Sequence, residues 1–494
     1  MGIDNKHPQY AEFIVDWQTM RDTYRGERVV KEKGEIYLPA TNGMYKDGMT
    51  MNQPGWQRYQ AYKQRAVFHD FVSDAVEAMI GMMHSKPTVI ELPKALEPLM
   101  EKATINGEGL PYLLRRINEQ QLTTGRLGLL LDLPLNPDPA NPLPYIALYR
   151  SEHIINWDDG AVDELTLPKL NLVVLDESEF ERTQDFSWKY VDKFRVLALG
   201  DIAANENAGL YTTGLFRDRQ ANFSPANMKA PCVRGKSLDS IPFVFVNTKD
   251  IIATPDDPPL LGLAQLALAI YRGEADYRQN LFMQSQDTLV VIGSGEEEFR
   301  VGSGATLTLP QGGDAKYIGV TATGLPEQRQ ALENDKMAAA NKAGQLIDTR
   351  SQQKESGDAL KIRVAAQTAT LNQIALTGAA GLQELLRKAA EWVGADPSEV
   401  VVTPNLDFAN DELNSRTLVE LMTAKTMGAP LSRKSIHKMM QDKSLTEMDY
   451  DEELEEIAEE EPLGGTGTDA GGNPWYDPSA EDNADPEETT GNGA

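Results

Sequence analysis

The chain has 494 residues, enough for about three domains of ordinary size, each with a core of its own. Its content of 41% hydrophobic and 25% charged residues is typical of a globular protein and excludes a fibrous or wholly disordered one. The net charge of −28 at pH 7 argues against tight wrapping of nucleic acid, because such binding needs Lys and Arg at the phosphates.

The negative charge is spread unevenly along the chain. The segment from Asp451 to the end holds 15 acidic residues and no Lys or Arg, whereas the preceding 450 residues hold 60 acids against 47 bases. The single cysteine, Cys232, excludes an intrachain disulfide and fits a reducing compartment. No apolar run approaches the roughly 18–20 residues that span a bilayer, and no signal-peptide pattern is present, so we expect no membrane association.

Residues 1–135 are expected to be mostly helical. Apolar residues recur at helical spacing between Ala61 and Met83, which predicts one helix there. A second amphipathic helix is predicted over Leu110–Thr124. It leads into a short apolar strand that begins at Gly128 and stops at Pro134.

Residues 136–255 have a β-rich pattern. Four prolines between positions 137 and 144 indicate an extended connector. Short β-like runs separated by polar turns follow, and we expect them to build a small β-rich domain. The predicted strands are Tyr145–Tyr149, Leu170–Leu175, Tyr190–Leu199, Leu210–Phe216 and Ile241–Val246.

Residues 256–409 combine long helices with one β-rich insert. Helices are predicted over 256–287, 325–347 and 359–393, and the insert at 288–324 reads as three strands (TLVVIG, GATLTLP and KYIGVT). A polar loop at 348–358 precedes the longest helix, and a strand at Val400–Val402 follows it. Gly378 and Gly381 are candidate kink points of that helix.

The second of these helices has an apolar side made mostly of small residues. Small side chains let helices pack closely, so the pattern suits a ring of like helices. The residues are Ala331, Ala338, Ala339, Ala340 and Ala343.

The last 85 residues change from helical to acidic and polar. Residues 410–460 are expected to be helical, ending in the acidic run DEELEEIAEEE, and residues 461–494 to be disordered in isolation. No internal repeat of 20–50 residues is found. The fold class predicted for the whole chain is α+β, predominantly helical.

Motifs for catalysis fail at named positions. The five histidines are far apart in the sequence and form no metal-binding pattern. Gly235-Lys236-Ser237 resembles the end of a phosphate-binding loop, but Ala230 stands where its first glycine belongs, which favours an ordinary turn. Gly293-Ser294-Gly295 begins a dinucleotide motif, but Glu298 replaces the third glycine, which favours a hairpin. We therefore expect no catalytic residues, no metal and no cofactor, and a protein that is not an enzyme.

The order of parts, with several stretches of sequence, resembles the portal proteins of tailed double-stranded DNA bacteriophages. The match is to one portal family, catalogued as a conserved phage domain of unknown function. The stretches begin at Trp17 (WQTMRDTYRGERVVKEKGEIYLP), Gly125 (GRLGLLLDLP), Tyr149 (YRSEHIINW), Lys354 (KESGDALKIR) and Glu391 (EWVGADPSEVVVTPNLDF). Together they span nearly the whole chain apart from its tail.

The resemblance implies a portal fold that assembles as a ring. It implies a helical wing region at 1–135, a β-rich wing domain at 136–255, stem helices at 256–287 and 325–347, and a clip at 288–324. It further implies a tunnel loop at 348–358, a long wing helix and strand at 359–409, a helical crown at 410–460 and an acidic tail at 461–494. All nine ranges are expectations.

The implied function is the channel for DNA packaging and ejection at one capsid vertex. The implied partners are other copies of the chain in a ring of about twelve, double-stranded DNA in the channel, the terminase, head–tail adaptors, and the major capsid and scaffold proteins. The implied location is the virion, after assembly in the host cytoplasm. The alternatives are another structural or scaffold virion protein and, less favoured, a nucleotide-dependent enzyme.

An acidic channel would repel DNA phosphates, so that the duplex moves without sticking, and a few basic residues would steady it. The candidates that lie on or beside the second stem helix and the tunnel loop are Lys336, Lys342, Arg350 and Lys354. The alternative is that these are solvent-exposed helix charges that pair with Glu333, Asp335 and Asp348.

Overall fold

The structure is a computed structural model of the chain, which divides into two compact units, Met1–Phe408 and Ala409–Ala494. Of the residues that the structure describes, 50% are helical and 19% are strand, which confirms a mixed helix and sheet protein. It describes residues 2–134, 143–160, 169–199, 209–217, 227–233, 235–284, 288–292, 311–318, 324–344, 357–406, 408, 423, 432–442 and 448–459.

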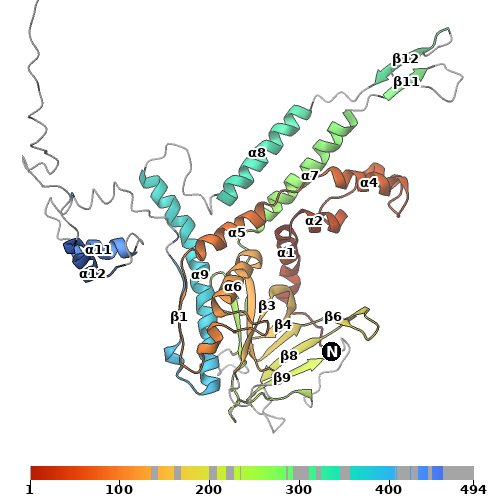
Figure 1. The fold of residues 1–494 in the computed structure, drawn as a ribbon. Helices are drawn as coiled ribbons and strands as arrows, with labels where there is room; N and C mark the ends of the chain where they lie inside the picture. The colour runs from red at the N-terminus through yellow and green to blue at the C-terminus, as the bar shows by residue number, and fades with distance from the viewer. Residues whose placement is uncertain are drawn as a thin grey trace, which may run out of the picture. The chain divides into compact units, whose positions relative to one another are not determined.

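Helices dominate the first 124 residues (Figure 1). The predicted helix over Leu110–Thr124 is confirmed as α6. The single helix predicted over Ala61–Met83 is wrong, because the backbone is extended at Ala66 and the chain divides into α4 and α5. Phe68, in the connection between them, is buried and packs edge-on against Tyr271, with ring centroids 5.9 Å apart. The other helices are α1 (Pro8–Tyr24), α2 (Glu27–Lys33), α3 (Asn42–Lys46), α4 (Pro54–Arg65) and α5 (Phe71–Met83).

A three-stranded antiparallel sheet has the order β10-β2-β3. Its strands are β2 (Arg126–Asp132), β3 (Tyr145–Arg150) and β10 (Phe243–Asn247). Every residue of β2 is buried, since it is the central strand and both α6 and α9 (Gly357–Val393) contact it. The sheet therefore joins a strand from the predicted N-terminal helical region to strands of the predicted β-rich domain.

A second antiparallel sheet has the order β4-β5-β8-β9, and a separate two-stranded ribbon pairs β6 with β7. The run predicted as one strand, Tyr190–Leu199, is divided between the ribbon and the sheet, because residues 192–193 belong to neither strand. Strands β4 and β6 were not predicted from the sequence. The bounds are β4 (Ile154–Asp158), β5 (Leu172–Asp176), β6 (Glu179–Arg182), β7 (Trp188–Val191), β8 (Phe194–Leu199) and β9 (Tyr211–Phe216).

Two long helices flank a β insert in the following segment (Figure 1). They are α7 (Leu261–Gln284) and α8 (Leu325–Gly344), and the insert contributes the antiparallel pair β11 (Thr288–Ile292) and β12 (Asp314–Ile318). The predicted middle strand, GATLTLP, lies outside the described residues. The chain then forms α9 and the short strand β13 (Val401–Thr403), which pairs with β1 (Val89–Glu91).

Gly378 and Gly381 lie within α9, which runs without interruption from Gly357 to Val393. The two glycines instead mark places where α9 approaches its neighbours closely. A Cβ on Gly378 would come within 2.5 Å of the Asn118 amide on α6, and a Cβ on Gly381 within 2.4 Å of Val246 on β10. Their observed role is therefore close packing, and the interpretation as kink points stays a prediction.

The second unit contains the helices α11 (Arg433–Asp442) and α12 (Tyr450–Glu459) among its described residues. His437 of α11 is buried and packs edge-on against Tyr450, with ring centroids 5.3 Å apart. The predicted tail at 461–494 lies outside the described residues. Among the described helices of both units, none combines the length and the apolar character needed to cross a membrane.

Candidate functional site

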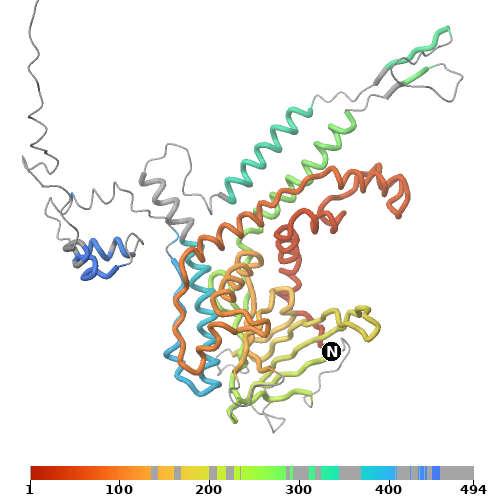
Figure 2. The backbone as a smooth tube through the Cα atoms, in the orientation of Figure 1, coloured from red at the N-terminus to blue at the C-terminus, as the bar shows by residue number. Residues whose placement is uncertain are grey.

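Helices α7 and α8 pack along each other in antiparallel directions (Figure 2). The direction follows from three contacts along the pair. The ammonium of Lys342 lies over Gly262, the Leu332 side chain lies over Gly273, and the Asn280 amide donates to Gln328 Oε1 at 3.2 Å. Glycines at two of these contacts let the α8 side chains approach the α7 backbone closely.

N-terminal helices also pack against α7. Helices α1, α4 and α5 all contact it, and α5 also contacts α8. The Tyr62 hydroxyl donates to Asp276 at 2.6 Å, and the Arg65 guanidinium stacks over the Phe282 ring at 4.2 Å. Consequently α7 is fixed to the body along much of its length, whereas α8 is held mainly by α7 and α5.

Glu274 on α7 is the electrostatic centre of the pair. Its side chain is only 4% exposed, and it accepts hydrogen bonds from Arg278 Nε at 2.7 Å and from Lys336 of α8. His69 Nε2, just before α5, lies 3.7 Å from the same carboxylate. Burial by itself would raise the pKa of Glu274, but the hydrogen bonds from Lys336 and Arg278 hold this pKa below its ordinary value of 4.5. One carboxylate thus links both long helices.

Most of the described surface of α8 is exposed. Leu332 and Ala339 are its buried side chains, and Ala343 is half-buried beside them. These three residues are seven and four positions apart, a spacing that places them on one face of the helix. Three of the predicted small residues, Ala331, Ala338 and Ala340, are exposed, so within one chain only part of the predicted small-residue side is covered.

Two of the four predicted basic candidates can be placed. Lys336 points to α7, where it pairs with Glu274 rather than with Glu333 or Asp335, the partners that the alternative interpretation named. Lys342 is exposed above Gly262. Arg350 and Lys354 lie outside the described residues. Among the described candidates, Lys342 is therefore the cation whose charge is least neutralised by its surroundings.

Three of the stretches that carry the sequence resemblance, those that begin at Trp17, Gly125 and Tyr149, contribute buried contacts to the first unit. Arg21 from the first stretch pairs with Glu152 from the third at 2.8 Å and also donates to Gln120 at 2.8 Å. Arg126 from the second stretch lies between the rings of Trp157 and Phe245, at 4.1 and 4.4 Å from their centroids. These roles were missed at the sequence level, although an arginine that opens an otherwise apolar strand was a signal.

Arg126 is fully buried, and its Nη2 donates to the Ala253 carbonyl at 2.6 Å. Its Nε and Nη1 have no hydrogen-bond partner among the described atoms. Burial lowers the pKa of Arg126 to about 9, and the negative charge of Asp159 offsets only part of this effect. The two aromatic faces supply the main compensation for this buried cation.

The motif at Gly235-Lys236 forms a tight turn in the structure. Gly235 has φ of 81°, and Val233 forms an antiparallel bridge with Lys236. The Lys236 ammonium donates to the Glu391 carbonyl at 2.8 Å, near the C-terminus of α9, and the Lys236 carbonyl accepts from Trp392 Nε1 at 3.2 Å. This lysine therefore holds α9 rather than framing a phosphate site. No group of three or more potential metal ligands occurs among the described residues.

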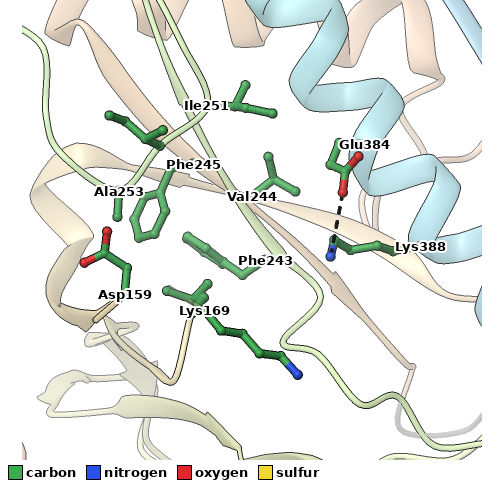
Figure 3. A pocket seen from close by; sticks show the side chains of 11 residues that line it. Asp159, Lys169, Phe243, Val244, Phe245, Ile251, Ala253, Glu384 and Lys388 are labelled. Carbon is green, nitrogen blue, oxygen red and sulfur yellow. Dashed lines mark ion pairs between the residues drawn. The ribbon is translucent and has the colours of Figure 1, made fainter. Parts of the chain in front are cut away.

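A pocket of about 340 Å³ lies between β10 and α9 (Figure 3). Its apolar lining includes Phe243, Val244 and Phe245 of β10, and the 251–253 segment faces them. Two carboxylates, Asp159 and Glu384, also line it, and Glu384 is 3.8 Å from Lys388 one turn along α9.

Comparisons with known proteins find one family model and several solved structures. A family model described as a domain of unknown function, DUF4055, matches residues 259–393, which span α7, β11, β12, α8 and α9. No curated protein matches the chain. Among solved structures, the chain is similar to a chain in the neck of a native gene transfer agent (GTA) particle computed with C12 symmetry, with 13% identity, a TM-score of 0.35, and coverage of 75% of this chain and 89% of that chain. It is also similar to a chain in the neck of an empty GTA particle computed with C6 symmetry, with 14% identity, a TM-score of 0.35, and coverage of 81% and 92%.

Proposed function

We propose that this chain is the subunit of a phage-type portal, a ring that sits at one capsid vertex and passes double-stranded DNA. The observation that carries the proposal is the antiparallel pair α7 and α8, which encloses a β insert in the sequence and precedes the longest helix. This is the order stem helix, clip, stem helix and wing helix implied by the sequence resemblance. The family match at residues 259–393 coincides with this segment.

In this proposal α7 and α8 form the stem and the β11–β12 insert forms the clip. The clip docks the terminase during packaging and the head–tail adaptors afterwards. A net charge of −28 per subunit keeps DNA phosphates from adhering along most of the channel. Lys342, with Arg350 and Lys354, supplies the few contacts that steady the duplex, whereas Lys336 serves the stem through Glu274.

Imaging of the purified chain tests the ring. We expect closed rings of about twelve copies by negative-stain microscopy and a matching mass by native mass spectrometry, when the chain is expressed alone or with the capsid and scaffold proteins. A monodisperse monomer at every concentration and ionic strength would contradict the proposal.

A nucleotide-binding assay on the same sample is expected to show no ATP binding, because ATP hydrolysis in portal systems belongs to the terminase.

The basic residues are tested by removing their charge in a phage that carries the gene. The triple change Lys342→Ala, Arg350→Ala and Lys354→Ala is expected to lower the amount of DNA retained per particle while rings still form. Arg329→Ala is the matched control, because its exposed guanidinium is already paired with Glu333 at 2.8 Å. Normal packaging and retention in the triple variant would remove the channel role of these residues.

A further inference from the structure

The ribbon β6–β7 presents an aromatic face that the described part of the chain leaves uncovered. Phe180 pairs across the ribbon with Tyr190, and Arg182 pairs with Trp188, so these four side chains share one face. Phe180 and Trp188 are 64% and 65% exposed, and Phe186 at the turn is 76% exposed.

The side chains of this face are already arranged with respect to one another. Phe180 and Tyr190 pack edge-on at 5.2 Å, and the Arg182 guanidinium lies over the Phe186 ring at 5.3 Å. Phe186 has φ of 65°, a left-handed conformation that is strained for a residue with a side chain. Aromatic residues and arginine are the types enriched at the centres of protein interfaces. A two-stranded ribbon is also marginally stable alone in water.

The pocket between β10 and α9 offers the complementary chemistry. Its floor is apolar, and Ile251 and Ile252 at its edge are 39% and 54% exposed. Asp159, which also lines it, is exposed; its charge acts on the buried Arg126, and Lys169 and Lys388 line the same pocket. In Figure 1 the ribbon projects to the right of the strands of the first unit, whereas α9 runs along their left side.

We propose that the aromatic face of β6–β7 in one subunit docks into the β10–α9 pocket of the next copy of this chain. The pocket, at about 340 Å³, has room for a large aromatic side chain, and Arg182 would meet the carboxylate of Asp159. Because the two surfaces differ, the contact is head-to-tail, the type that closes into rings. The inference rests on the proposed function and adds the contact between neighbouring wings.

Two surface variants test the contact from its two sides. Phe186→Ser with Trp188→Ser removes aromatic anchors, and Ile251→Lys with Ile252→Lys replaces the apolar edge of the pocket by repelling cations. Each variant alone is expected to need at least about tenfold more protein for half-maximal ring assembly than the wild type, as loss of interface anchors predicts. Far-ultraviolet circular dichroism is expected to show that both remain folded, since all four positions are exposed.

Mixing the two variants gives the sharper result. The intact ribbon of one can enter the intact pocket of the other, but no further subunit can join, so native mass spectrometry should detect one-to-one dimers. Lys189→Ser is the matched control, because Lys189 lies on the opposite face of the ribbon, across from Glu181, and rings should form as in the wild type.

The outcomes separate this inference from the proposed function. If the wild type forms rings and the Phe186→Ser, Trp188→Ser variant assembles equally well, the wing contact is wrong. The portal proposal is not affected by that result. The same conclusion follows if the ribbon variant forms normal rings but no longer attaches to capsids, because the ribbon would then bind a different protein. If the wild type forms no rings under any condition, both proposals fall.

Discussion

Two of the buried charged residues in the first unit are stabilised in opposite ways. Glu274 accepts hydrogen bonds from Arg278 and from Lys336, so its charge is compensated by ions. Arg126 has one hydrogen bond, to a carbonyl, and otherwise lies between two aromatic rings. The pKa of each is lowered, but for the acid this means a stabilised charge and for the base a destabilised one.

Glu274→Gln is expected to lower the free energy of unfolding by about 1–3 kcal/mol near neutral pH. This is less than the usual cost of breaking a buried pair, because Lys336 and Arg278 are themselves 33% and 44% exposed. Since the pKa of Glu274 is depressed in the folded state, its contribution is complete above the unfolded value of 4.5 and is lost as the pH falls through the folded pKa. Urea denaturation at neutral and acidic pH measures this: the free energies of unfolding of the wild type and of Glu274→Gln should become equal in acid.

Glu333→Gln is the matched control for that measurement. Glu333 pairs with Arg329 on the exposed surface of α8, where its side chain is 50% exposed. We expect a change of less than about 0.5 kcal/mol, as for other surface ion pairs. Equal effects at Glu274 and Glu333 would contradict the central role assigned to Glu274.

Arg126→Met is expected to cost less stability than Arg126→Ala. Methionine keeps most of the packing between Trp157 and Phe245 and removes the buried charge, whereas alanine leaves a cavity worth about 2–5 kcal/mol. The folded pKa of about 9 lies below the unfolded 12.5, so the wild type gains stability relative to the methionine variant as the pH rises above about 9. Thermal denaturation of the three proteins at neutral and alkaline pH measures both effects, and a larger loss for methionine than for alanine would contradict this explanation.

Among the elements, α9 joins most parts of the first unit. It contacts α5 and α6, strands β2 and β10 of the three-stranded sheet, and β13. Its glycines permit the closest of these contacts, at Gly378 against α6 and at Gly381 against β10. Backbone approach rather than helix propensity therefore determines the residue type at both positions.

Gly381→Ala is expected to destabilise the protein by about 1–3 kcal/mol, because the added methyl group would overlap Val246. Intrinsic propensity acts in the opposite direction by about 1 kcal/mol, since alanine favours helices over glycine. Gly81→Ala in α5 is the control, because no atom lies within 4 Å of its added Cβ, and it should be stabilising. Chemical denaturation would refute the packing role if Gly381→Ala were as stable as Gly81→Ala.

For the whole molecule, net charge opposes assembly of identical copies. Each chain carries −28, so subunits that approach one another in a ring repel over distances that salt screens. We expect the concentration for half-maximal ring assembly to fall as NaCl is raised from about 50 mM to about 500 mM. Mass photometry across a salt series measures this, and rings that dissociate with added salt would show that attractive ion pairs outweigh the net repulsion.

Local patterns were sufficient to predict several elements. The amphipathic spacing of Leu110–Thr124 gave α6, and the long apolar stripe beyond 359 gave α9, which begins two residues earlier. These patterns succeed because one face of each helix is buried. They also predicted a mixed fold of helices and sheet, since strand-like runs cluster between 145 and 247.

Only tertiary structure decided which residues meet. The apolar spacing over Ala61–Met83 predicts one helix, whereas in the structure Phe68, buried against Tyr271 of α7, lies in a break between two helices. Lys336 was a candidate for the channel, with ion pairs to acids close to it in the sequence as the alternative. Its partner Glu274 is 62 positions away, a separation that no local pattern encodes. Helical spacing determines which residues share a face. What that face packs against depends on how distant segments meet. The partners of Glu274, of Arg126 and of the two glycines of α9 were decided in this second way.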